Sequence, residues 1–187
     1  MGYNSNTRGY TDMRYSELLY EYKNLLFEDV RLSTHLQTIP KGYVTTKKIA
    51  GKDYFYLQYS VQGKKKSEYL REEDVLSVRH AIARREPLKV QMEEVRKDQL
   101  RLESAARILD VGLYRTFLFL KQCAKMDALP VAKRQEALLF SSAMTALEGL
   151  SAKPETDESL QQWARGKGSY MDIYMKALVQ YRVVEGM

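Results

Sequence analysis

Apolar side chains recur at a helical spacing near the start of the chain, after a polar stretch that ends at about Gly9. Between Asp12 and Leu36 these positions recur close to every 3.6 residues, and Thr11 with Asp12 supplies a candidate N-cap. Pro40 and Gly42 then interrupt the pattern. The sequence therefore predicts one amphipathic helix here, with apolar positions at Tyr15, Leu18, Leu19, Tyr22, Leu25, Leu26, Val30 and Leu32.

The next stretch changes to an alternating pattern that is rich in β-branched and aromatic residues. Three runs, residues 43–49, 53–61 and 65–70, are separated by two short turns that contain glycine. This pattern predicts a three-stranded antiparallel meander. Because so small a sheet is not stable alone, a neighbouring helix has to cover one face. Alternation places Tyr54, Tyr56 and Gln58 on one face, and Phe55, Leu57 and Tyr59 on the other.

Helical patterns follow the predicted sheet. The acidic residues 72–74 favour a helix start, and this helix is expected to end near Arg85. A long, highly charged helix follows Pro87 and extends to about Leu109. It would suit packing against the first helix, or self-association into a homo-oligomer. Residues 113–126 form the most apolar helix and are expected at the buried centre of the helical part.

A second helical unit is expected to begin near Pro130. Its last helix is predicted to open at Ser169, with Asp172 completing a capping box. The predicted fold class is therefore mainly α with a small three-stranded antiparallel β-meander (α+β) and a helical C-terminal unit. The predicted domains are residues 1–129, which hold the sheet and the long helices, and residues 130–187.

The net charge of +6 is concentrated in the predicted sheet. Residues 41–71 hold eight basic and two acidic side chains, a difference of +6, whereas residues 131–187 hold seven of each. A local excess of this kind indicates a surface for an acidic partner. The alternative is a solvated sheet edge that lysines protect from aggregation.

The same stretch carries the candidate residues for nucleic-acid binding. Lysines supply phosphate contacts and exposed tyrosines supply stacking surfaces. The candidates are Lys47, Lys48, Tyr54, Tyr56, Lys64, Lys65 and Lys66. Residues 39–49, followed by residues 54–59, are similar to the start of many small uncharacterised bacterial proteins, and they loosely resemble the three-stranded arm-type DNA-binding modules of integrases. That resemblance implies DNA as a partner, while aromatic packing under lysine-coated edges is the alternative.

Side chains that carry out chemistry are few in this sequence. Cys123 is the single cysteine and lies in an apolar run, which indicates a buried, unreactive thiol. His35 and His80 have no second ligand at metal-binding spacing, and there is no phosphate-binding loop. We therefore expect a binding protein rather than an enzyme, with no catalytic residues, no metal site and no cofactor.

The sequence predicts a cytoplasmic protein without a membrane partner. The N-terminus lacks a charged start followed by an apolar run, as a signal peptide would have. No stretch approaches the roughly 18 uninterrupted apolar residues of a membrane span.

The C-terminal third contains a segment that resembles a known inhibitory helix. Residues 137–150, ALLFSSAMTALEGL, look like the inhibitory helix of the VbhA-type antitoxins, which bind and silence Fic-domain AMP-transferases. A proline-containing connector, a short helix, a glycine turn and a final amphipathic helix follow in the order of that family. The resemblance spans roughly residues 131–184. It implies a Fic-domain toxin as the protein partner.

The family signature is Ser or Thr, three residues, Glu, then Gly or Asn. Glu148 and Gly149 match it, whereas Met144 occupies the position of the hydroxyl residue and Thr145 lies next to it. The resemblance implies that Glu148 pairs with a toxin arginine that would otherwise hold the ATP γ-phosphate. Met144 cannot make the hydrogen bond of the usual hydroxyl, so inhibition would be weakened or lost. The alternative is that Glu148 is a solvated residue at a helix end.

Two functions follow from these patterns. The first is an antitoxin-like Fic inhibitor that carries Glu148 and contacts its partner through Trp163, Tyr174 and Leu178, with an N-terminal module for nucleic acid or for stability. The second is a nucleic-acid-binding or scaffold protein that uses the basic sheet and has no toxin partner.

Overall fold

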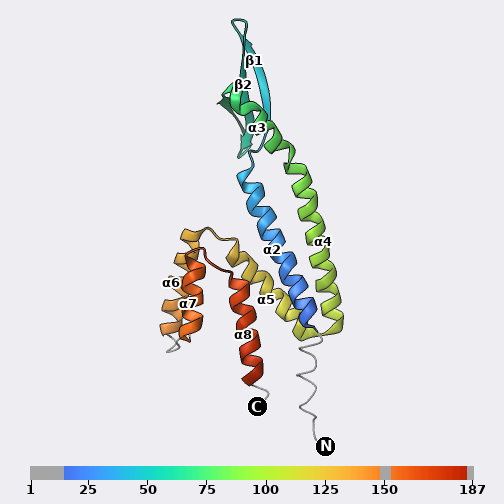
Figure 1. Ribbon diagram of the computed structural model, residues 1–187, viewed down its shortest axis with the longest axis vertical. Helices are drawn as coiled ribbons and strands as arrows, with labels where there is room; N and C mark the ends of the chain where they lie inside the picture. The colour runs from blue at the N-terminus through green and yellow to red at the C-terminus, as the bar shows by residue number, and fades with distance from the viewer. Residues whose placement is uncertain (1–14, 148–152, 185–187) are drawn as a thin grey trace, which may run out of the picture. The chain divides into compact units, whose positions relative to one another are not determined.

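The computed structural model describes residues 15–147 and 153–184 of the chain (Figure 1). Residue contacts divide the chain into two units, one formed by residues 31–96 and the other by residues 1–30 together with 97–187. Two helices, α2 (Ser16–Thr38) and α4 (Arg85–Leu109), contribute residues to both units. The predicted fold class, mainly α with a small three-stranded antiparallel sheet, is confirmed.

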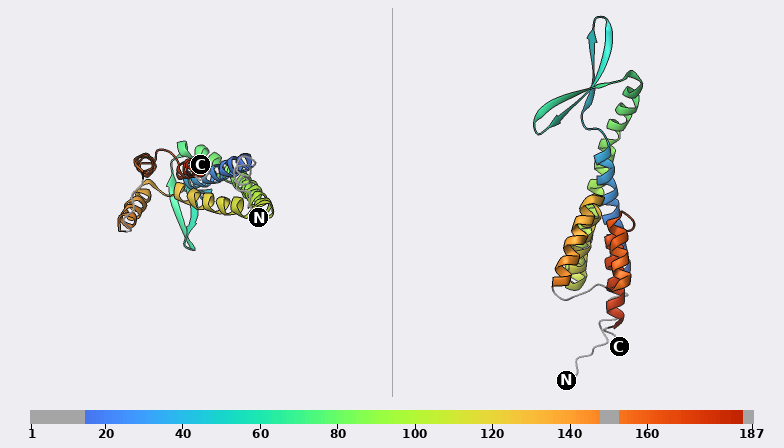
Figure 2. Two further views of the ribbon diagram at one scale, coloured as in Figure 1. Left: turned by 90° about the horizontal axis from the view of Figure 1, so that it is seen from below. Right: turned by 90° about the vertical axis from the view of Figure 1, so that its left-hand side faces the viewer.

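The unit of residues 31–96 contains the sheet, whose strands are β1 (Tyr43–Ile49), β2 (Lys52–Val61) and β3 (Lys64–Leu70). They pair antiparallel in the order β1-β2-β3. The two hairpin turns lie at opposite ends of the sheet, as the right-hand view of Figure 2 shows. Each turn has two residues with positive φ, Ala50 with Gly51 and Gln62 with Gly63, which is the backbone geometry of a tight hairpin whose twist matches its strands.

One face of the sheet is covered by α3 (Glu72–Ala83). This helix contacts β1 and β2. Leu57 in β2 and Val75 in α3 are both buried, so the covered face is the one that carries Leu57. Beside this packing, the Arg85 guanidinium donates hydrogen bonds to the carbonyls of Leu36 and Ile39, at 2.8 and 2.7 Å. These bonds satisfy carbonyl groups at and just beyond the last turn of α2, which no longer have helical partners.

The other unit is helical and centres on α5 (Val111–Asp127), whose many buried residues agree with the buried central helix predicted for residues 113–126. Helix α8 (Tyr170–Val184) packs on α5, α7 (Pro154–Ala164) packs on α8, and α6 (Val131–Leu147) packs on α7. The rings of Tyr22 and Phe117 stack in the core with their centroids 4.1 Å apart. The buried core consists of Leu19, Tyr22, Leu26, Ala106, Leu113, Phe117, Leu120, Cys123, Ala124 and Met171.

Residue contacts group the C-terminal helices with α5 instead of into a separate unit that begins at residue 130. Helix α8 packs directly on α5, and Met171 of α8 is part of the core that α5 centres. Asp127, at the end of α5, adds polar contacts to the start of α8. A cut at residue 130 would separate α8 from α5 and from Asp127. That residues 130–187 fold independently stays a prediction.

Candidate nucleic-acid interface

The strand register assigns every residue of the sheet to a face. Directly paired residues of antiparallel strands share a face, and neighbours along a strand alternate. Lys47 pairs with Tyr54, and Tyr56 pairs with both Thr45 and Tyr69. The face that these pairs define, called here the tyrosine face, consists of Tyr43, Thr45, Lys47, Ile49, Lys52, Tyr54, Tyr56, Gln58, Ser60, Lys65, Ser67 and Tyr69.

Three tyrosines form a ring cluster in the middle of this face. The Tyr69 ring lies 5.8 Å from that of Tyr56, edge to face, and 6.4 Å from that of Tyr54. The Lys47 ammonium lies over the Tyr56 ring, 4.8 Å from its centroid. Despite these neighbours Tyr69 is 59% exposed, and Tyr43 on the far strand is 57% exposed. The cluster therefore presents aromatic surface and positive charge together.

The two faces of the sheet differ in charge. The tyrosine face has three lysines, Lys47, Lys52 and Lys65, and no carboxylate, which gives +3. The Leu57 face has Lys48, Lys64 and Lys66 together with Asp53 and Glu68, which gives +1. Most of the uncompensated charge thus lies on the tyrosine face.

One carboxylate of the Leu57 face is already occupied by a neighbour. The Tyr59 hydroxyl donates a hydrogen bond to Glu68, on the adjacent strand. This hydrogen bond is the largest cause of a raised pKa at Tyr59, because the neutral hydroxyl is the form that donates. Tyr59 is therefore engaged within the Leu57 face and is separate from the exposed ring cluster.

The structure brings together only part of the predicted set. Lys47, Tyr54, Tyr56 and Lys65 share the tyrosine face, whereas Lys48, Lys64 and Lys66 point to the opposite one. Sequence reasoning missed Lys52, Tyr43 and Tyr69. The two-residue turns with glycine could have identified these residues. A turn of fixed length sets the strand register, and the register determines which residues of adjacent strands share a face.

The residues predicted for Fic inhibition lie on or beyond the end of α6. Glu148 and Gly149 are outside the described residues, as is the side chain of Thr145. Met144 is exposed on α6, near Phe140 and Leu147, which are 70% and 82% exposed. The apolar face of this helix is therefore open to solvent.

Two of the predicted partner-binding residues are used inside the fold. Trp163 is only 1% exposed, and its indole N–H donates to Asp127 Oδ1 at 2.9 Å. Tyr174 is partly buried, with its ring 4.4 Å from that of Phe119. Leu178 is partly exposed on α8. Partner contact through Trp163 would require it to leave the core, so the exposed residues of α6 are the better candidates.

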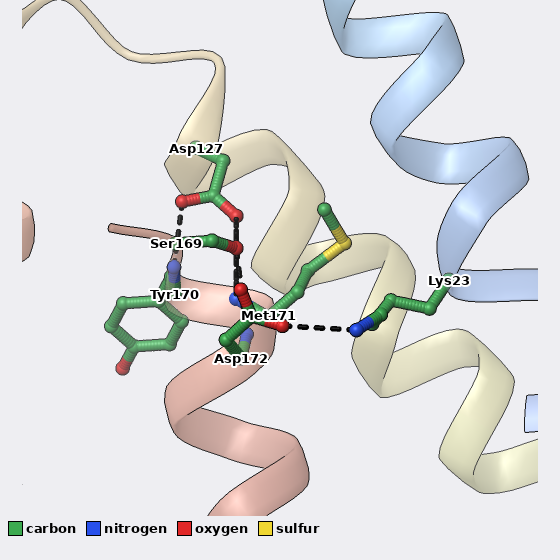
Figure 3. Close-up of polar contacts among 6 residues, drawn as sticks. All are labelled: Lys23, Asp127, Ser169, Tyr170, Met171 and Asp172. Atoms are coloured by element: carbon green, nitrogen blue, oxygen red, sulfur yellow. Dashed lines mark hydrogen bonds and ion pairs between the residues drawn. The ribbon is translucent and has the colours of Figure 1, made fainter. Parts of the chain in front are cut away.

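Asp127 joins the end of α5 to the start of α8 (Figure 3). Its carboxylate accepts hydrogen bonds from the Ser169 hydroxyl at 2.7 Å and from the backbone N–H groups of Tyr170 and Met171 at 2.7 and 3.2 Å. Ser169 also caps the helix as predicted, since its hydroxyl accepts from the backbone N–H groups of Met171 and Asp172. The Asp172 side chain pairs with Lys23 at 3.0 Å. A carboxylate at a helix N-terminus is stabilising, so this is a structural junction.

Other reactive groups are few in the described part of the chain. Cys123 is buried as predicted, and desolvation raises the pKa of its thiol to about 12. No three His, Cys, Asp or Glu side chains among residues 15–147 and 153–184 gather as a metal site would require. No helix within the same ranges is long and apolar enough to cross a membrane.

Comparison with known proteins places a family match on the region of the sheet. Residues 13–80 match a family described as a domain of unknown function, DUF6788. This range includes α2, all three strands and most of α3, and it ends before the segment that resembles the antitoxins. No curated protein and no solved structure matches the chain.

Proposed function

We propose that the protein binds nucleic acid through the tyrosine face of its sheet. The observation that carries the proposal is the set of three lysines around a tyrosine cluster in which Tyr69 is exposed, with no carboxylate on the same face. Ammonium groups at such positions pair with phosphates and release counterions. Aromatic rings beside them offer apolar contact to sugars and bases.

The competing interpretation, a purely structural role for the tyrosines, fits the sheet less well. A packing role predicts that the rings are buried, as Leu57 is on the opposite face. Tyr54 and Tyr56 are partly buried, but Tyr69 and Tyr43 are the most exposed large hydrophobic side chains of the sheet, and α3 packs on the Leu57 face. Lysines placed only to protect sheet edges would also not be expected to separate from acidic residues by face.

The test compares two triple variants with the same charge change on opposite faces. Lys47→Gln, Lys52→Gln and Lys65→Gln together should weaken binding of all sequences alike, by roughly tenfold to a hundredfold, and reduce the salt slope by about two to three. Fluorescence anisotropy with labelled oligonucleotides at several salt concentrations measures both quantities.

The control combines Lys48→Gln, Lys64→Gln and Lys66→Gln on the Leu57 face. It removes the same net charge, so it should reproduce the loss only if attraction depends on total charge alone. Equal losses in the two variants would contradict a defined face. A wild-type chain that binds neither duplex nor single strands at low salt would remove the proposal.

A second candidate function is inhibition of a Fic-domain AMP-transferase, favoured by the exposed apolar face of α6. Residues 137–147 contain no charged side chain, and Leu139, Phe140 and Leu147 are each at least 70% exposed. An amphipathic helix that inserts into a groove of a partner requires such a face. The VbhA-type resemblance lies on the same helix, and it supplies the proposed role of Glu148.

For this second function, Glu148→Ala should restore AMP transfer by the Fic partner while the complex stays intact. Binding would rest on the apolar face of α6, whereas inhibition would rest on one carboxylate near the ATP phosphates. Met144→Ser should tighten inhibition by restoring the missing hydroxyl. Pull-down together with ATP-dependent modification by a Fic-domain protein encoded next to this chain measures both effects. Inhibition that Glu148→Ala leaves unchanged, with binding preserved, would mean that the motif is accidental.

A further inference from the structure

The tyrosine face offers aromatic surface in a form that suits unpaired bases. The Tyr69 ring lies against the rings of Tyr54 and Tyr56 on the adjacent strand β2, yet more than half of its surface is exposed. A ring that is oriented by its neighbours loses little conformational freedom when a base stacks on it. In a duplex the base faces are already stacked on one another, whereas a single strand presents them freely.

The polar side chains of the same face do not suit reading of base edges. Recognition in the major groove of a duplex relies on bidentate donors and acceptors, chiefly Arg, Asn and Gln. Among the residues of the tyrosine face there is no Arg or Asn. The single glutamine, Gln58, accepts a hydrogen bond from the Tyr43 hydroxyl at 2.9 Å, so its amide oxygen is already occupied. The face is therefore equipped for stacking and phosphate contacts and poorly equipped for base-edge readout.

The lysines lie toward both ends of the ring cluster along the strands. Lys52 follows the turn between β1 and β2. Lys47, which pairs with Tyr54, lies near the same end of the sheet. Lys65 follows the other turn, opposite Ser60. Since β2 has ten residues, it spans about 33 Å at the usual rise of a strand. A nucleic-acid strand that runs along the sheet would meet positive charge, then rings, then positive charge.

We propose that the ligand of the tyrosine face is a single strand of nucleic acid, bound without base-sequence preference by stacking on Tyr69 and by phosphate contacts to the lysines at the two ends. This inference rests on the proposed nucleic-acid function and deepens it. The proposed ligand is an unpaired strand, and the proposed stacking residue is Tyr69, which the sequence pattern did not single out.

The first measurement compares ligands on the full-length wild-type chain. A labelled 20-nucleotide mixed-sequence DNA strand should bind at least about tenfold more tightly than the duplex made from it. A second strand of different sequence should bind with similar affinity. RNA of the same sequence is measured as well. Because only RNA has a 2′-hydroxyl, the comparison distinguishes a DNA strand from an RNA strand as the ligand.

The second measurement isolates stacking from charge. Tyr69→Ala should weaken single-strand binding by about fivefold to a hundredfold with an unchanged salt slope, because the phosphate contacts remain. Tyr69→Phe keeps the ring and should retain wild-type affinity. Tyr20→Ala serves as a matched control, since Tyr20 is an exposed tyrosine on α2 outside the sheet.

The outcomes separate this inference from the function on which it rests. Tighter binding to the duplex, or equal losses for Tyr69→Phe and Tyr69→Ala, would overturn the single-strand stacking inference while the lysine result stands. Absence of binding to either form by the wild type would overturn both.

Discussion

Replacement of Asp127 by alanine is expected to lower the free energy of unfolding by about 4 kcal/mol, because it leaves several buried donors without an acceptor. The carboxylate is itself buried, and it accepts from the Trp163 indole, the Ser169 hydroxyl and two backbone N–H groups at the start of α8. Three of these four donors belong to buried residues, Trp163, Ser169 and Met171, and so cannot turn to water instead. Urea unfolding followed by circular dichroism measures the change.

Two matched variants show whether burial and hydrogen bonding cause this effect. Asp127→Asn keeps one acceptor oxygen and should cost clearly less than Asp127→Ala. Asp172→Ala removes an acidic residue from the same helix start, but its ion pair with Lys23 is about half exposed at the carboxylate. Such a pair contributes roughly 0–1 kcal/mol, so a loss at Asp172 as large as that at Asp127 would contradict the assignment.

The sheet was largely predictable because its determinants are local. Two glycine turns of fixed length and an alternating pattern are enough to specify three strands. The predicted strand ranges match the observed ones at four of their six ends and differ by one residue at the other two. What the pattern left open was the face of each lysine, which depends on the pairing across strands. The two-residue turns fix the strand register. Deriving that register from the sequence would have placed Lys47 and Lys65 on one face and Lys48, Lys64 and Lys66 on the other.

The junction at Asp127 could not be predicted in the same way. Its partners Trp163 and Ser169 lie 36 and 42 residues further along the chain, so nothing in a local window connects them. The capping pattern at Ser169 was visible, but the carboxylate that completes it comes from α5, while Asp172 turns to Lys23. For the same reason Trp163 was expected at a partner surface, although the fold uses it in the core.

Replacement of Gly42 by alanine is expected to disrupt the sheet, at a cost of about 4 kcal/mol from a steric clash combined with backbone strain. Gly42 has φ of +108°, which L side chains rarely adopt. A Cβ at this position would lie 2.0 Å from the carbonyl oxygen of Gln58 and 2.8 Å from its carbonyl carbon. Both atoms belong to the backbone of β2, so no change of rotamer relieves the contact.

The displacement would fall on the first pair of the ladder, where Tyr43 lies opposite Gln58. Hydrogen exchange of the β1 and β2 amides, together with urea unfolding of the full chain, measures the loss. Gly51→Ala is the control: its φ is also positive, at +81°, but nothing lies within 4 Å of the added Cβ. It should cost only about 1–2 kcal/mol, the usual penalty of the left-handed conformation. Since the tyrosine face depends on the pairing of all three strands, Gly42→Ala should also abolish oligonucleotide binding, whereas Gly51→Ala should retain it. Equal stability of the two variants would show that Gly42 does not hold β1 against β2.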